Sequence, residues 1–240
     1  MKAVVLAGGA GARLGPYTAN FPKPLMPLDN AMPVLELLLR QLRSMGFADV
    51  TLAVNHFHQL IEAYFQDGGR FGVRLTYRVE ERPLGTAGPL AALLDDLGPT
   101  FLVMNGDLLT TLDFRNLARA HHRAGAAATI AAVRRDLRSD FGVLSLDEEA
   151  SLTAYEEKPI QSQVVSMGCY VLERDAVSRF LEPGVRLDIP DLMRALISDG
   201  QRVHGHLSEA FWLDIGRPED YAAAQAEFAR DPGRFLVEPT

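Results

Sequence analysis

The stretch that decides the fold is the N-terminal segment MKAVVLAGGAGARL, residues 1–14. Its apolar run, residues 3–7, predicts a buried strand. Three glycines follow and end the strand, and they allow bare backbone N–H groups to come close to a ligand: Gly8, Gly9 and Gly11. The segment therefore predicts a strand that opens into an anion-binding loop.

Two cationic side chains lie on the same connection. Arg13 follows the glycines directly, and Lys23 stands in the segment FPKPLMPL, residues 21–28. The prolines on both sides of Lys23 restrain its backbone, so its ammonium group can be presented at a fixed place. Backbone N–H groups beside two cations predict that the anion is a triphosphate.

The spacing excludes two familiar phosphate-binding loops. A Walker loop needs Gly, four residues and then Gly-Lys-Ser/Thr, but here Lys23 lies far beyond Gly11. A dinucleotide-binding fold needs Gly-x-Gly-x-x-Gly at the start of a helix, and the third glycine is missing. A nucleotide-dependent oxidoreductase is therefore disfavoured.

Length and composition predict a single soluble domain, residues 1–240, and a cytoplasmic protein. The 240 residues are 48% hydrophobic and 23% charged, and no linker-like stretch divides them. The net charge of −7 argues against nucleic acid as a partner, and no apolar run is long enough for a signal peptide or a membrane helix. The single cysteine, Cys169, agrees with a reducing compartment.

Strand and helix patterns alternate along the chain, which predicts a mostly parallel sheet with helices on both faces. The predicted strands are 3–7, 49–54, 73–79, 100–104, 127–133, 143–144, 152–157, 164–172 and 203–207, and the predicted helices are 35–45, 60–65, 86–97, 112–122, 174–181, 190–198 and 218–229. The fold class is thus a Rossmann-like, three-layer α/β/α arrangement. We expect a nucleotide-binding half, residues 1–135, and a second half, residues 136–230, that includes a small insertion covering the substrate edge.

Five motifs in one order resemble the sugar-1-phosphate nucleotidyltransferases, also called nucleoside-diphosphate-sugar pyrophosphorylases, over residues 1–225. They are LAGGAGARL with KPL (6–14 and 23–25), PLGTAG (83–88), NGD (105–107), EEKP (156–159) and WLDIGRPEDY (212–221). The resemblance is greatest to the enzymes that transfer guanylyl groups to mannose 1-phosphate. It implies an enzyme whose partners are a nucleoside triphosphate and a sugar 1-phosphate, and whose products are a nucleoside-diphosphate sugar and pyrophosphate. The sequence leaves a homo-oligomer open.

The resemblance also implies a role for particular residues of this chain. The catalytic residues would be Arg13, Lys23 and Asp107, and Asp107 with Asp214 would bind Mg²⁺, a cation that commonly takes one or two carboxylates together with phosphate oxygens. The nucleotide would contact Leu6, Ala7, Gly8, Gly9, Gly11, Arg13, Glu80, Gly85 and Thr86. The sugar phosphate would contact Gly142, Glu157, Lys158 and Ser166.

The nucleobase is the least determined part of the reaction. By the resemblance, Glu80 meets the edge of the base, and a carboxylate, which only accepts hydrogen bonds, suits the two adjacent donors of guanine. This favours GTP, with mannose 1-phosphate or a related sugar phosphate as acceptor. UTP or dTTP remains the alternative if Glu80 instead faces water. A catalytically silent, ligand-sensing relative is the alternative of another class, although such a protein would be expected to lack one of the charged site residues.

Overall fold

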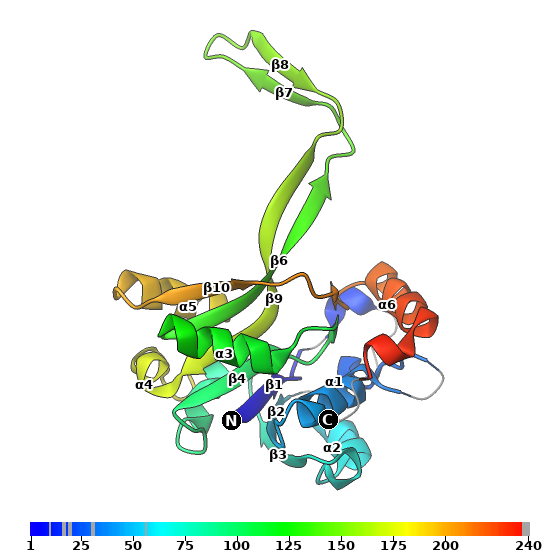
Figure 1. The fold of residues 1–240 in the computed structure, drawn as a ribbon, viewed down its shortest axis with the longest axis vertical. Coiled ribbons are helices and arrows are strands. Elements are labelled where there is room, and N and C mark those ends of the chain that lie inside the picture. The colour runs from blue at the N-terminus through cyan, green and yellow to red at the C-terminus, as the bar shows by residue number, and fades with distance from the viewer. Residues whose placement is uncertain (10, 16–17, 19–20, 30–31, 56, 237–240) are drawn as a thin grey trace.

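The computed structural model describes residues 1–9, 11–15, 18, 21–29, 32–55 and 57–236, and its centre is a seven-stranded sheet (Figure 1). The strand order is β10-β6-β9-β4-β1-β2-β3, and within it β9 runs antiparallel to its two neighbours while the other pairs are parallel. The strands of this sheet are β1 (Lys2–Leu6), β2 (Asp49–Val54), β3 (Arg74–Val79), β4 (Thr100–Asn105), β6 (Ala128–Arg138), β9 (Ile160–Glu173) and β10 (Val203–Leu207). The mixed α/β fold with a mostly parallel sheet is confirmed.

Helices cover both faces of the sheet. One face packs against α1 (Val34–Ser44), α2 (His58–Phe65), α3 (Phe114–Ala124) and α6 (Pro218–Arg230). The other packs against the 3₁₀ helix η4 (Gly88–Leu93), α4 (Arg174–Val177) and α5 (Ile189–Ser198). Further 3₁₀ turns are η1 (Ala12–Leu14), η2 (Lys23–Leu25), η3 (Gly69–Phe71), η5 (Ser178–Phe180) and η6 (Pro232–Arg234).

Strand β1 lies in the interior of the sheet because both of its faces are apolar. Ala3 and Val5 point into one hydrophobic cluster and Val4 into the other, and all three are fully buried. Fully burying a valine side chain contributes about 1.5–3 kcal/mol, so this short strand can hold both layers together. Its carboxyl end, at Leu6, delivers the glycine loop to the same edge of the sheet as the ends of β2 and β4.

Two features of the fold differ from the sequence prediction. The expected helix 86–97 is a 3₁₀ segment with turns on either side; Pro89 disfavours the α-helical conformation at Gly88, and the N–H groups of Ala87 and Gly88 bond to the carbonyl of Leu187. A small antiparallel sheet was also missed, made of β5 (Leu108–Thr110) and β11 (Trp212–Asp214). Three-residue strands carry too little alternation to be recognised in a sequence.

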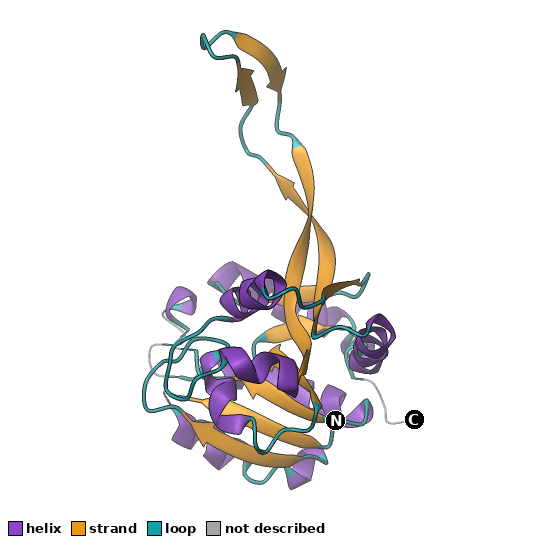
Figure 2. Cartoon of the chain, turned by 90° about the vertical axis from the view of Figure 1, so that its left-hand side faces the viewer, coloured by secondary structure: helices purple, strands orange, loops and turns teal. Residues whose placement is uncertain are grey.

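The insertion forms an arm that projects from the body (Figures 1 and 2). Strands β6 and β9 are longer than predicted and stay paired as far as Arg138 and Ile160. Beyond them, β7 (Val143–Leu146) pairs with β8 (Leu152–Glu156) at the distal end. The arm rises from the edge at which the parallel strands end, yet it stands away from that edge rather than lying over it. In the described residues no helix is both long and apolar enough to span a bilayer.

Candidate active site

A cavity of about 420 Å³ opens at the carboxyl ends of β1, β2 and β4. This is the edge at which doubly wound sheets bind ligands. The cavity is lined by Leu6, Gly8, Gly9, Ala53, Asn55, Glu80, Pro83, Leu84, Gly85, Thr86, Asn105 and Asp107. Seven of these residues were predicted from the sequence: Leu6, Gly8, Gly9, Glu80, Gly85, Thr86 and Asp107.

Ala53 and Asn55 were missed because nothing in the sequence alone says which strand lies beside β1. The parallel pairing of β1 with β2 brings the end of β2 to the glycine loop. Asn105 was passed over although it opens the NGD motif. A signal for both asparagines exists, since each comes at the end of a buried strand, where binding residues of parallel sheets gather.

Glu80 faces the glycine loop. A Cβ atom placed on Gly8 would lie 3.3 Å from its Oε1, while its Oε2 accepts a hydrogen bond of 3.1 Å from the N–H of Leu84. Burial raises the pKa of this carboxyl, and the bond from Leu84 partly offsets that effect. The side chain is thus turned into the cavity and carries one oxygen that can receive a further donor.

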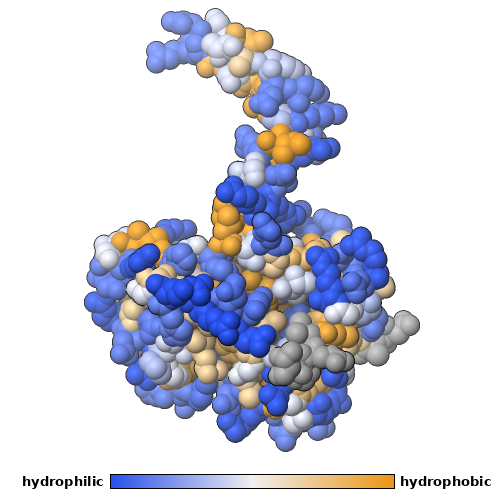
Figure 3. All heavy atoms as spheres, in the orientation of Figure 1, coloured by the Kyte–Doolittle hydropathy of each residue, from blue (hydrophilic) through white to orange (hydrophobic). Residues whose placement is uncertain are grey.

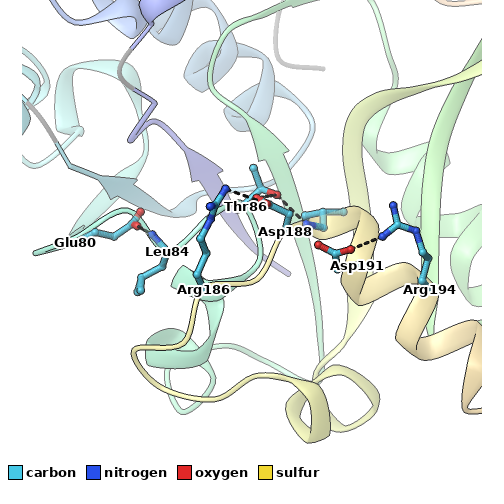
Figure 4. A network of polar contacts seen from close by, with 8 residues as sticks. Glu80, Leu84, Thr86, Arg186, Asp188, Asp191 and Arg194 are labelled. Atoms are coloured by element: carbon cyan, nitrogen blue, oxygen red, sulfur yellow. Dashed lines mark hydrogen bonds and ion pairs between the residues drawn. The ribbon is translucent and has the colours of Figure 1, made fainter.

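The loop that carries Gly85 and Thr86 is tied to the segment before α5 (Figure 4). Gly85 has φ +79°, and a Cβ atom there would lie 2.5 Å from the carbonyl oxygen of Leu187, so only glycine fits. Asp188 Oδ1 accepts a hydrogen bond of 3.0 Å from the N–H of Thr86. The hydroxyl of Thr86 accepts a hydrogen bond of 2.8 Å from the N–H of Ile189. These bonds fix one wall of the cavity.

Lys23 and Asp107 form an ion pair at the floor of the site, between Nζ and Oδ2. The lysine side chain is only 11% exposed, so the pair is largely withdrawn from water. The other carboxylate oxygen of Asp107, Oδ1, is buried, and no group of the described residues lies within hydrogen-bonding distance of it. A buried carboxylate oxygen without a partner is costly, which points to a cationic ligand at this place.

Asp214 lies beside this pair because β11 pairs with β5: Asp214 is opposite Leu108, and the N–H of Ile215 donates to the carbonyl of Asp107. Burial, and after it the charge of Asp107, raise the pKa of Asp214, whereas Lys23 and Arg13 lower it. Arg13 is close, since a Cβ atom on Gly216 would lie 3.4 Å from Asp214 Oδ2 and 3.8 Å from Arg13 Nη2. The two predicted metal carboxylates and the two predicted cations therefore meet.

The donor set fits a magnesium ion. Two carboxylates, one with an unpartnered oxygen, are hard oxygen ligands of the kind Mg²⁺ prefers, and substrate phosphates commonly complete its coordination. Within the described residues, no group of three or more histidine, cysteine, aspartate or glutamate side chains is arranged so that it could hold a metal ion by itself.

The remaining predicted nucleotide-binding residues, Ala7, Gly11 and Arg13, are not among those that line the cavity. Ala7 is buried, and its N–H donates a hydrogen bond of 2.8 Å to the carbonyl of Ala53. This bond anchors the start of the loop. Gly11 has φ +64° and its carbonyl accepts hydrogen bonds from Leu14 N–H and from the Thr18 hydroxyl. These contacts turn the chain so that Arg13 follows directly.

The predicted sugar-phosphate residues are divided between the body and the arm. Ser166 lies where the arm joins the body: its hydroxyl contacts the N–H of Gly168, and a Cβ atom on Gly168 would lie 2.7 Å from Asn105 Nδ2. Gly142, Glu157 and Lys158 stand on the arm, where Glu157 accepts a hydrogen bond from Tyr155. The structure does not bring these three to the cavity.

The structure is a mixed α/β fold with a cavity at the carboxyl ends of its parallel strands and two carboxylates, Asp107 and Asp214, close together. The family model described as nucleotidyl transferase matches residues 2–231, and the chain belongs to this family. The chain is 35% identical to the mannose-1-phosphate guanylyltransferase of Mycobacterium tuberculosis, over 96% of this chain and 65% of that protein. It is 34% identical to the UTP–glucose-1-phosphate uridylyltransferase of Synechocystis, over 92% of this chain and 61% of that protein. It thus spans about three fifths to two thirds of these relatives.

A solved structure shares the whole fold. A candidate glucose-1-phosphate thymidylyltransferase from Bacillus anthracis superposes with a TM-score of 0.77 at 26% identity, over 99% of this chain and all of that one. The fold of this chain therefore matches that structure over nearly its whole length.

Asp188→Ala should loosen the loop 84–88, because it removes the acceptor of the Thr86 N–H. Losing one such bond costs about 1 kcal/mol, or roughly five-fold in the opening equilibrium. Hydrogen–deuterium exchange of the Thr86 amide should accelerate by that factor. The matched control is Asp191→Ala, which removes an exposed ion pair with Arg194 on α5 and should leave the exchange of the loop unchanged. Equal exchange in Asp188→Ala and the unaltered chain would show that Asp188 does not hold the loop.

Proposed function

We propose that this protein joins a nucleoside triphosphate and a sugar 1-phosphate to give a nucleoside-diphosphate sugar and pyrophosphate. The observation that carries the proposal is the meeting of Asp107, Asp214, Lys23 and Arg13 beside a cavity walled by the glycine loop and Glu80. Family membership and both curated relatives support the same reaction class.

The reaction needs charge and position more than covalent chemistry. An oxygen of the sugar phosphate attacks the α-phosphorus, the bond to the bridging oxygen breaks, and pyrophosphate leaves with the electron pair. Both substrates are anions, so cations must reduce their repulsion and stabilise the charge that builds on the leaving oxygens. Mg²⁺ held by Asp107 and Asp214 would supply part of that charge.

The side chains of this chain supply the rest. We propose that Lys23, held by the Asp107 carboxylate, stabilises the α-phosphate and that Arg13 holds the β- and γ-phosphates in a two-pronged contact. The backbone N–H groups of Gly8, Gly9 and Gly11 would contact phosphate oxygens, and Leu6, Gly85 and Thr86 would border the base and ribose. Ala7 would act through the anchoring of the loop.

The sugar phosphate would enter between the cavity and the base of the arm. Ser166 and Asn105 are the polar groups on that side. For Gly142, Glu157 and Lys158, the proposal requires the whole arm to bend toward the cavity where β6 and β9 leave the body, so that the junction between its two sheets, residues 139–142 and 157–159, comes nearer to the cavity. Lys158 would then offer its ammonium group to the sugar phosphate.

GTP is the triphosphate we propose, with mannose 1-phosphate or a related sugar phosphate as acceptor. Glu80 has an oxygen directed at the glycine loop, and guanine presents two adjacent donors that a carboxylate can accept. The two curated relatives named above differ in their nucleotide, one being a guanylyltransferase and the other a uridylyltransferase. The base preference must therefore be measured for this chain.

The function is tested by pyrophosphate release from the purified chain with Mg²⁺, each of GTP, UTP, dTTP, ATP and CTP, and a panel of sugar 1-phosphates. We expect release that needs both substrates and is fastest with GTP. Preference for a pyrimidine triphosphate would replace the proposed nucleotide and keep the reaction class. Binding of a nucleotide-sugar without turnover of any pair would favour the silent, ligand-sensing alternative.

Asp107→Asn should lower kcat by at least about a thousandfold without changing the fold, because an amide is a poor ligand for Mg²⁺. Steady-state kinetics at saturating Mg²⁺ measure this. Asp113→Asn is the matched control: Asp113 caps α3 at the surface, and asparagine caps equally well, so its kcat should stay normal. A near-normal kcat in Asp107→Asn would remove this carboxylate from the site.

Glu80→Gln should reduce the GTP-to-UTP ratio of kcat/KM by about ten- to a hundred-fold, the effect of losing a charged hydrogen-bond acceptor. Its exposed neighbour gives the control, Glu81→Gln, which should leave the ratio unchanged. Since burial raises the pKa of Glu80, the accepting carboxylate is lost as the pH falls through that raised value. The ratio should therefore fall on mild acidification in the unaltered chain and stay flat in Glu80→Gln.

Lys158→Ala should raise KM for the sugar phosphate about ten-fold and leave KM for the triphosphate unchanged, the expected loss from one charge-assisted contact. Both constants come from the same pyrophosphate assay. An unchanged KM for the sugar phosphate would mean that the arm does not bring Lys158 to the site and that the sugar phosphate is held from the body alone.

A further inference from the structure

The arm, residues 134–164, carries most of the large apolar side chains that the protein exposes. Among the described residues sixteen such side chains are exposed, and nine of them lie on the arm: Leu137, Phe141, Val143, Leu144, Leu146, Leu152, Tyr155, Ile160 and Val164. Figure 3 shows hydrophobic residues at several places along this slender projection, among hydrophilic ones. Apolar groups gathered in this way mark an interaction surface.

The distal sheet of the arm has one apolar face. Leu144 pairs with Tyr155 and Leu146 with Leu152, with a register shift between the two pairs. Cross-strand partners share a face, and so do residues two apart on one strand, so all four side chains point the same way. They are 53–61% exposed. A two-stranded sheet of this kind is marginally stable by itself in water, so a partner that covers the face would stabilise the arm.

Charge is segregated along the arm. Arg134, Arg135 and Arg138 lie on its proximal part, where β6 pairs with β9, and outnumber the one acidic side chain there, Asp136. Asp147, Glu148 and Glu149 form the turn at the far end. One arm therefore presents a positively charged proximal part and a negatively charged distal end. A second arm that runs in the opposite direction would complement this charge pattern.

We propose that two copies of this chain pair through their arms in an antiparallel, two-fold symmetric dimer. The apolar face of each distal sheet packs on the proximal part of the other arm, where Ile160 and Val164 share one face with Arg134 and Arg138 through their register. The acidic turn of each arm lies against the arginines of its partner, which selects the antiparallel orientation.

The chain's own body is a poorer partner for the same face. An arm folded back over its own cavity would bring its acidic end toward Asp107, Asp214 and a bound triphosphate, which like charges oppose. A second copy instead meets both the apolar face and the charge pattern. Pairing would also set how far each arm can bend toward its own cavity, and with it the position of Lys158.

The test is the mass of the full chain in solution, measured by sedimentation at micromolar concentration. We expect a dimer for the unaltered chain. In Leu152→Glu the dissociation constant of the dimer should rise at least ten-fold. Ile197→Glu, a matched change at an equally exposed position on α5, should stay dimeric. Circular dichroism and thermal unfolding check that each variant is folded. A monomeric unaltered chain, or a Leu152→Glu variant as dimeric as Ile197→Glu, would overturn the proposal.

Charge reversal tests the orientation without touching the apolar face. The proximal variant Arg134→Glu with Arg138→Glu, and the distal variant Glu148→Lys with Glu149→Lys, should each be monomeric alone because each contact then joins like charges. Mixed in equal amounts they should form a heterodimer, since both contacts become complementary again. Two monomeric variants that stay monomeric on mixing, or variants that remain dimeric alone, would exclude the antiparallel pairing.

Discussion

The buried contact between Lys23 and Asp107 is the interaction on which the site depends. Lys23 neutralises one oxygen of the carboxylate and leaves the other, Oδ1, buried without a partner among the described residues. Asp214 adds a second carboxylate whose pKa is raised by burial and by the charge of Asp107. A dication that arrives with a triphosphate would give the buried Oδ1 of Asp107 and the carboxylate of Asp214 a common partner.

The fold brings these groups together from distant parts of the chain. Lys23 follows β1, Asp107 follows β4, and Asp214 ends β11, whose pairing with β5 sets it beside Asp107. The opposite wall of the cavity is assembled in the same way, since Glu80 follows β3 and the loop 83–88 is held from the segment before α5. Asp107, Asp214 and Glu80 lie at the ends of paired strands, whereas Lys23, on η2, is held by its ion pair with Asp107. The fold itself thus positions these three carboxylates, as catalysis by charge and placement would require.

Much of the fold and of the candidate site could be predicted from the sequence, because local residue patterns mark the strands and the motifs that follow them. The buried strand before Gly8 and the strand before Asn105 have strong apolar patterns, so their ends were located correctly and the motifs after them were placed at one edge. The contributions of Ala53 and Asn55 could not be predicted, because they depend on strand order. The same holds for the pairing of β5 with β11, which is formed by two short strands far apart in the sequence. The insertion and its strands 143–144 and 152–157 were predicted, but its projection as an arm was not, because the alternation of β6 and β9 continues in polar and mixed residues, where burial no longer separates the two faces. Gly142, Glu157 and Lys158 consequently remain predictions that depend on how the arm moves.

The most direct test of the central claim is the binding of Mn²⁺, a paramagnetic substitute for Mg²⁺, followed by electron paramagnetic resonance of the free ion. The titration uses the unaltered chain and Asp214→Asn, each with and without a non-hydrolysable triphosphate analogue. The account predicts that the analogue tightens Mn²⁺ binding by the unaltered chain and that Asp214→Asn weakens the ternary complex by at least about ten-fold, since it loses a carboxylate ligand. Equal Mn²⁺ affinity of the two proteins in the presence of the analogue would contradict the account.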